Sequence, residues 1–105
     1  MAEGLRGFNV PHYIALIHKE LNSIYGVSFP DVPGVIAAAD TLDDALSEAA
    51  EALAFAAEDW ETHSDAPFPV PRSLDALRED PRFSARAQDA VVAAVPLAAP
   101  VGHAA

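Results

Sequence analysis

The sequence predicts an α+β fold: a three-stranded antiparallel sheet with one long helix across it and an additional edge strand. Three observations predict it. Apolar residues alternate along two segments near the amino terminus, an amphipathic helix with a clear start begins at Thr41, and a valine-rich run returns near residue 90. The expected order is therefore strand, strand, strand, helix, strand. A chain of 105 residues suffices for one such domain, which we assign to residues 1–100, with residues 101–105 as a flexible tail.

Two strands are expected first, joined as a hairpin. The segment 12–20 alternates, and its two faces carry Ile14 and Leu16 on one side and Tyr13, Ala15 and Ile17 on the other. A turn at Asn22 and Ser23 follows. The next segment, up to residue 29, places Tyr25, Val27 and Phe29 on one face.

The stretch "PDVPG" ends the hairpin and predicts a rigid corner. Pro30 and Pro33 donate no backbone hydrogen bond, and each biases the residue before it towards extended geometry. Gly34 can adopt a positive φ, which suits a reversal of chain direction. We therefore interpret Pro30, Asp31, Pro33 and Gly34 as a structural motif that aims a short third strand, "VIAAAD", whose small side chains leave room for a helix.

The long helix has the clearest signals in the chain. Thr41 is placed to cap it, with Asp44 three residues later, and the helix is expected to run to about His63. Its apolar stripe should pack on the sheet. The members of this stripe are Leu42, Leu46, Ala49, Leu53, Ala56 and Trp60. The large side chains expected to dominate the core are Ile14, Leu16, Val27, Phe29, Leu46, Leu53 and Trp60.

The opposite face of this helix is the candidate partner-binding site. It carries carboxylates around one aromatic residue, and its members are Asp44, Glu48, Glu51, Phe55, Glu58 and Asp59. Such a face suits a basic protein partner, although a charged face is often only solvated. Phe55 favours the docking interpretation. Its alternative positions are under the following connector or in a homodimer contact.

The remaining chain predicts a connector, a short helix and a final strand. Three prolines stiffen the connector of residues 63–73, and Ser73 is placed to cap a helix that runs to about Glu79 and is stopped by Pro81. The final strand lies within residues 90–100, and Pro96 indicates a sheet edge because proline cannot donate to a central ladder.

Composition excludes several classes of function. Sixteen acidic residues against six Lys and Arg give a net charge of −10, which disfavours direct contact with nucleic acid. There is no cysteine, hence no disulfide or thiolate site. No signal-peptide or membrane-spanning run is apparent, so we expect a cytoplasmic protein without membrane contact.

No catalytic or metal-binding constellation is apparent either. His12 and His18 share a strand face without a third ligand nearby, while His63 and His103 are distant along the chain. The carboxylates lie on an exposed helix without an apolar pocket to separate their pKa values. We therefore expect no enzyme, no metal and no cofactor.

The stretch from Tyr25 to Leu53 contains an ordered set of motifs: an aromatic-glycine pair, a Phe-Pro-Asp strand end, a Pro-Gly corner and an Asp-Thr-Leu helix start. They are Tyr25-Gly26, Phe29-Pro30-Asp31, Pro33-Gly34 and Asp40-Thr41-Leu42, followed by Ala45-Leu46, Ala49 and Glu51-Ala52-Leu53. In this order the motifs resemble the HicB-like antitoxin family. With the flanking strands, the resemblance spans roughly residues 12–98.

This resemblance implies a partial double-stranded-RNA-binding-domain-like fold and an antitoxin function. The implied partner is a small basic ribonuclease toxin, an HicA-like mRNA interferase, whose active site the antitoxin covers. Many members add a carboxy-terminal DNA-binding segment, and this chain ends soon after its last expected strand. We therefore expect no operator binding by this chain. The alternative is a homo-oligomeric interaction module without a toxin partner, and self-association is expected in either case from the edge strands and the exposed aromatic.

Overall fold

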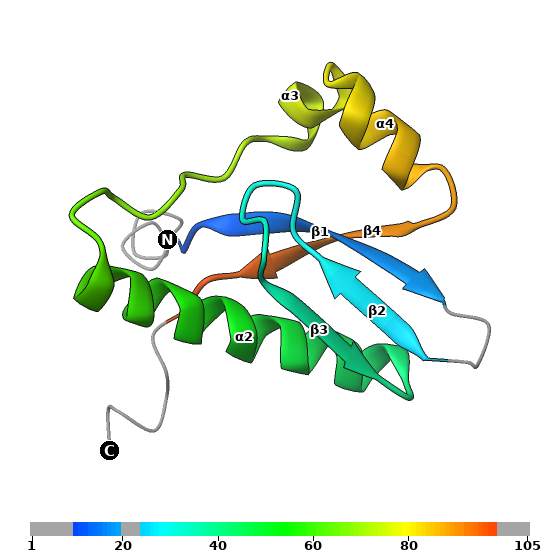
Figure 1. Ribbon diagram of the computed structural model, residues 1–105. Helices are drawn as coiled ribbons and strands as arrows, with labels where there is room; N and C mark the ends of the chain where they lie inside the picture. Colours follow the sequence, from blue (N-terminus) through cyan, green and yellow to red (C-terminus); the bar gives the residue numbers. More distant parts are fainter. Residues whose placement is uncertain (1–9, 20–23, 99–105) are drawn as a thin grey trace, which may run out of the picture.

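Four antiparallel strands form the centre of the fold in the order β3-β2-β1-β4 (Figure 1). In this computed structural model, which describes residues 10–19 and 24–98, the strands are β1 (His12–Lys19), β2 (Tyr25–Ser28), β3 (Ile36–Ala39) and β4 (Val91–Pro96). The predicted α+β class and strand order are confirmed. β4 pairs with β1, with Pro96 opposite His12, so proline lies in an edge strand as predicted.

Helix α2 (Leu42–His63) packs across one face of this sheet. Thr41 caps it, since its Oγ1 accepts a hydrogen bond from the Asp44 N–H at 3.1 Å. Ala49 and Leu53 of the predicted stripe are fully buried, whereas Leu46 and Trp60 are only partly buried. The fully buried Ala45 was missing from the predicted stripe. Ala45 and Ala49 share this core with the small side chains of Ala37 and Ala39 of β3.

Two short helices, α3 (Leu74–Arg78) and α4 (Pro81–Ala87), lie on the other side of the sheet (Figure 1). Leu16 of β1 is buried there with Leu77 and Phe83. The predicted short helix and its Ser73 cap are confirmed, since the Ser73 Oγ accepts from the Ala76 N–H at 3.1 Å. Helix α4 was not predicted.

Pro81 ends one helix and begins the next. The Asp80 carboxylate accepts a hydrogen bond from the Arg82 N–H at 2.9 Å, and Pro81 occupies the first turn of α4. A proline at this position loses no helical hydrogen bond, because the first N–H groups of a helix have no partner within it. The pair Asp80-Pro81 is therefore a helix-start signal as well as a stop.

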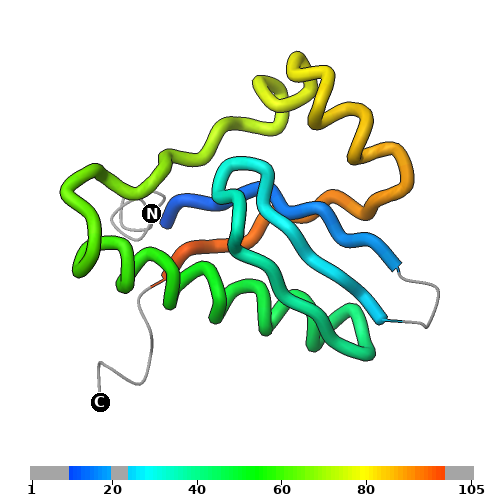
Figure 2. The backbone as a smooth tube through the Cα atoms, in the orientation of Figure 1, coloured from blue at the N-terminus to red at the C-terminus, as the bar shows by residue number. Residues whose placement is uncertain are grey.

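The connector between α2 and α3 runs past the end of the sheet, as the backbone tube shows (Figure 2). Phe68 lies edge-on to Tyr13 and Trp60, with ring centroids 5.9 and 5.5 Å apart. The Tyr13 hydroxyl donates to the Pro69 carbonyl, and the Trp60 Nε1–H donates to the Ala66 carbonyl at 2.8 Å. These contacts explain why Trp60 is partly exposed: it packs against the connector and not against the centre of the sheet.

The predicted corner is built from two consecutive turns. The Val32 N–H donates to the Phe29 carbonyl, and the Val35 N–H donates to the Val32 carbonyl, both at 3.2 Å. Gly34 has a φ of 99°, as its predicted role in the reversal requires.

Three predictions fall outside the described residues: the turn at Asn22 and Ser23, the tail of residues 101–105, and any role of His103. Within the described ranges, no helix combines the length and the apolar character needed to cross a membrane.

Candidate protein-binding site

The outward face of α2 presents all six predicted partner-binding residues to solvent. We call Asp44, Glu48, Glu51, Phe55, Glu58 and Asp59 the acidic face; every one of them is exposed. They recur at spacings of three and four residues, which places them along one side of a helix. The other side of α2 carries the buried Ala45, Ala49 and Leu53. Burial of the inner face of α2 therefore determines which of its side chains point outward.

Charge on this face is concentrated and of one sign. Helix α2 holds seven Asp and Glu residues and no Lys or Arg. The side chains of Glu48 and Glu51 have no hydrogen-bond or ion-pair partner in the described part of the chain. Asp59 lies 3.2 Å from the Nδ1 atom of His63 one turn later. The face can therefore offer several carboxylates to an incoming cation.

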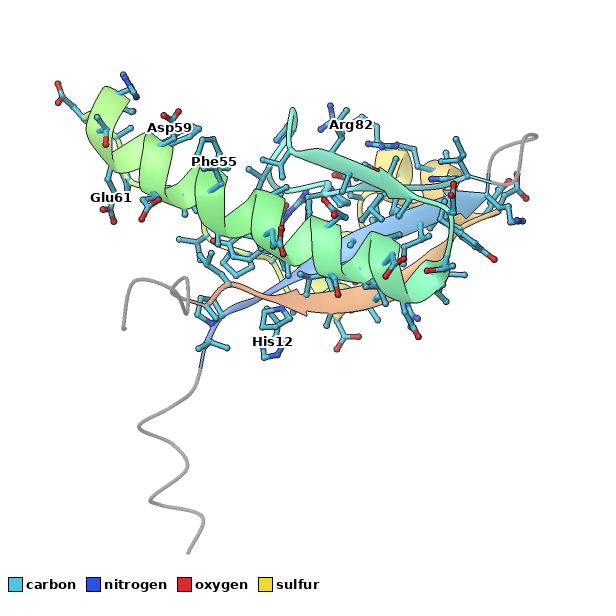
Figure 3. All side chains as sticks on the ribbon, turned by 90° about the horizontal axis from the view of Figure 1, so that it is seen from below. His12, Phe55, Asp59, Glu61 and Arg82 are labelled. Atoms are coloured by element: carbon cyan, nitrogen blue, oxygen red, sulfur yellow. The ribbon has the colours of Figure 1, made fainter. Side chains whose placement is uncertain are left out.

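Phe55 is the apolar centre of the acidic face. Its side chain is 68% exposed and points outward from α2 near Asp59 (Figure 3). The interpretation that Phe55 lies under the connector is wrong, because Phe55 is largely exposed; the connector instead packs Phe68 against Tyr13 and Trp60. Exposing the apolar phenylalanine ring to water is unfavourable in the free chain. A partner that covers the ring removes this unfavourable hydration free energy.

A second surface feature was missed by the sequence analysis. A groove of about 510 Å³ lies beside α4, lined by Pro30 and Pro33 of the corner and by Arg72, Arg82 and Arg86. Its floor contains Leu16 and Phe83. The available signal was the spacing of Arg82 and Arg86 after the helix start at Asp80-Pro81, since residues four apart share a helix face.

Ion pairs organise the arginine side of this groove. Arg72 Nε lies 2.7 Å from Asp31 Oδ1, and Arg72 Nη1 lies 3.3 Å from Asp80 Oδ2. The hydrogen bonds to Asp31 and then to Asp80 raise the pKa of Arg72. The hydrogen bond from the Arg82 N–H, reinforced by Arg72, lowers the pKa of Asp80.

The two histidines of β1 each contact a backbone carbonyl oxygen. His12 Nδ1 lies 3.0 Å from the Val10 carbonyl oxygen, and His18 Nε2 lies 3.0 Å from the Arg86 carbonyl oxygen. No group of three or more His, Asp or Glu side chains among the described residues could hold a metal ion.

Comparisons with known proteins identify similar antitoxins. A family model described as the HicB_like antitoxin of bacterial toxin-antitoxin system matches residues 13–100. No curated protein matches the chain significantly.

Among solved structures, the chain is similar to the N-terminal domain of Burkholderia pseudomallei antitoxin HicB, with 31% identity and a TM-score of 0.68 over 83% of this chain and 98% of that one. The structure of antitoxin HicB from the same organism matches with 32% identity and a TM-score of 0.65, over 80% of this chain and 61% of that one. The chain thus spans about three fifths of that longer antitoxin. A chain of the HicA3 and HicB3 toxin-antitoxin complex matches with 26% identity and a TM-score of 0.63, over 80% of this chain and 94% of that one.

Proposed function

Since the chain belongs to the HicB-like antitoxin family, whose members are non-enzymatic binding proteins, we propose that it binds a small basic ribonuclease of the HicA type and masks the surface that grips RNA. It acts in the cytoplasm, where such a ribonuclease meets messenger RNA. A homologue of similar fold is part of a HicA3 and HicB3 complex, which supports a partner of the same kind here.

The acidic face is the surface we assign to this partner. A ribonuclease must carry positive charge where it holds the phosphate backbone. The carboxylates of α2 offer negative charge at repeated spacing along one helix side, so they compete with RNA for the same cations. The net charge of −10 also accelerates encounter with a basic protein.

Phe55 supplies the apolar contact that charge alone lacks. Exposed ion pairs contribute little net affinity, because water solvates the separated charges well. A buried aromatic residue at the centre of an interface contributes more, particularly when polar neighbours exclude water around it. The exposed ring, with Glu48, Glu51 and Asp59 around it, matches this arrangement.

The observation that carries the proposal is the coincidence of family membership with an exposed, single-sign helix face centred on Phe55. The test begins with the tagged chain purified from its native host. We expect a small basic protein to copurify at equal stoichiometry, and we expect its separately purified form to cleave RNA until one equivalent of this chain is added. The matched control is the Glu48→Lys, Glu51→Lys double variant, whose fold should be intact because both side chains are exposed.

A copurified protein without ribonuclease activity would contradict the proposal, and so would a ribonuclease that remains active with this chain in excess. Recovery of the chain alone, as a homogeneous oligomer, would favour the alternative of a homo-oligomeric interaction module.

A further inference from the structure

The basic residues of this acidic chain are gathered on one side of the molecule. The chain has six Lys and Arg residues, and four of them, Arg72, Arg78, Arg82 and Arg86, fall within residues 72–86. This segment holds α3 and α4, which lie on the opposite side of the sheet from α2 (Figure 1). The same segment also holds Asp75, Glu79 and Asp80, so its four arginines are accompanied by three carboxylates. The molecule therefore carries most of its arginines on one side of the sheet and the acidic face on the other.

The groove beside α4 combines this positive charge with apolar walls. Three arginines, Arg72, Arg82 and Arg86, line it together with one acidic residue, Asp80. The rings of Pro30, Pro33 and Phe83 supply apolar surface. A ligand that fits such a groove carries carboxylates beside an apolar side chain, because guanidinium groups bind carboxylates in a fork geometry and also stack on aromatic rings.

Two of the three groove arginines, Arg72 and Arg86, are held in place before any ligand arrives. Arg72 is fixed by Asp31 and Asp80. The Arg86 Nη2 group donates to the Ser28 hydroxyl at 3.0 Å. Arg82 is 92% exposed and lies 3.7 Å from the Asp80 carboxylate, so most of its donors face solvent. Restrained side chains lose less conformational entropy on binding than free ones do.

The acidic face of α2 has the features that this groove requires. It offers an aromatic ring, Phe55, with carboxylates one turn away on either side at Glu51 and Asp59. We propose that the arginine groove of one copy binds the acidic face of a second copy. The two surfaces differ and lie on opposite sides of the sheet, so the contact is head-to-tail and extends into a ring or an open chain.

This contact has a regulatory consequence that rests on the proposed function. The same α2 residues would serve the second copy and the ribonuclease, so the two partners exclude each other. Self-association would then cover Phe55 in the free antitoxin and release it by mass action when the toxin appears.

The test uses this chain alone, so its result is independent of the toxin. A groove variant carries Arg82→Glu and Arg86→Glu, and a face variant carries Glu51→Lys and Phe55→Ala. Arg78→Glu is the control, charge-matched to the single variant Arg82→Glu, because Arg78 is exposed and does not line the groove. Sedimentation velocity over a wide concentration range measures assembly, and circular dichroism checks the fold. If the groove variant fails to fold, Arg82→Glu alone replaces it, since that side chain is almost fully exposed.

We expect the parent and Arg78→Glu to self-associate with equal affinity, and each interface variant to weaken association at least about tenfold. The decisive sample is an equimolar mixture of the two variants. Each retains one intact surface, so the mixture should form 1:1 pairs that grow no further. A parent that stays monomeric would overturn the proposal, as would a groove variant that assembles like the parent or a mixture that forms no pair.

Discussion

The Asp31 carboxylate binds Arg72 twice. Its Oδ2 accepts the Arg72 backbone N–H at 2.7 Å, and its Oδ1 accepts the side-chain Nε–H, also at 2.7 Å. The two residues are 41 positions apart in sequence. The corner after β2 is thereby tied to the end of the connector that leads into α3.

This double contact predicts a graded loss of stability on substitution. Asp31→Ala removes both hydrogen bonds and leaves the Arg72 amide without its partner, so we expect the thermal midpoint to fall by roughly 4–8 °C. Asp31→Asn should lose less, because its amide oxygen still accepts one of the two N–H groups. Differential scanning calorimetry measures both. Equal midpoints for parent and Asp31→Ala would show that the tie contributes nothing to the fold.

Leu53 tests the packing of α2 on the sheet. The side chain is fully buried, so Leu53→Ala should lower the free energy of unfolding by about 2–5 kcal/mol in denaturant titrations. The matched control lies two residues away: Phe55→Ala removes a larger but exposed side chain and should change stability by less than about 0.5 kcal/mol. A comparable loss in both variants would contradict the assignment of Leu53 to the inner face and Phe55 to the outer face of α2.

Leu77 tests the layer formed by α3 and α4. Its side chain is fully buried against Leu16 and Phe83, so Leu77→Ala should also cost about 2–5 kcal/mol. Because this cluster is small, we further expect amide hydrogen exchange to accelerate most in residues 74–87. If amide exchange instead accelerated evenly over α2 and the strands, the layer of α3 and α4 would not unfold separately from the rest of the domain.

Tyr13 predicts a loss of stability at alkaline pH. Burial, followed by the negative charge of Asp31, raises the pKa of Tyr13 above its usual value of 10.0. The folded state therefore favours the neutral phenol. The associated stability is fully present below pH 10.0 and is lost as the pH rises through the higher pKa of the folded state.

The Tyr13→Phe variant separates this effect from other alkaline titrations. At neutral pH it should lose about 0.5–1.5 kcal/mol, since the hydrogen bond to the Pro69 carbonyl is gone. Its stability should then fall less steeply than that of the parent above pH 10.0. Denaturant titrations at several pH values give both quantities. Parallel pH profiles would contradict the assigned cause.

Local signals predicted most of the fold. Thr41 and Ser73 were recognised as caps because a hydroxyl before a helical pattern satisfies free N–H groups, and both make those bonds. Pro96 indicated an edge strand from its missing donor alone. The class, the strand order and the limits of α2 followed from such local rules.

Features that depend on tertiary contacts were missed. Leu16 was correctly expected in the core, but its burial against Leu77 and Phe83, which are distant in sequence, was not predicted. Tyr13, Ala15 and Ile17, on the other face of β1, belong to the main core and were missing from the expected core residues. Helix α4 was missed because Pro81 was interpreted only as a stop. The arginine groove joins the corner after β2 to α4, and no local pattern brings those two segments together.

The most direct test of the account is the binding kinetics of this chain with its copurified ribonuclease at two ionic strengths. We expect Glu48→Lys with Glu51→Lys to slow association and to flatten its salt dependence, while Phe55→Ala weakens the complex by about 2 kcal/mol through faster dissociation. Circular dichroism should show both variants folded. If both variants bind like the parent, the acidic face is only a solvated surface and the central claim is wrong.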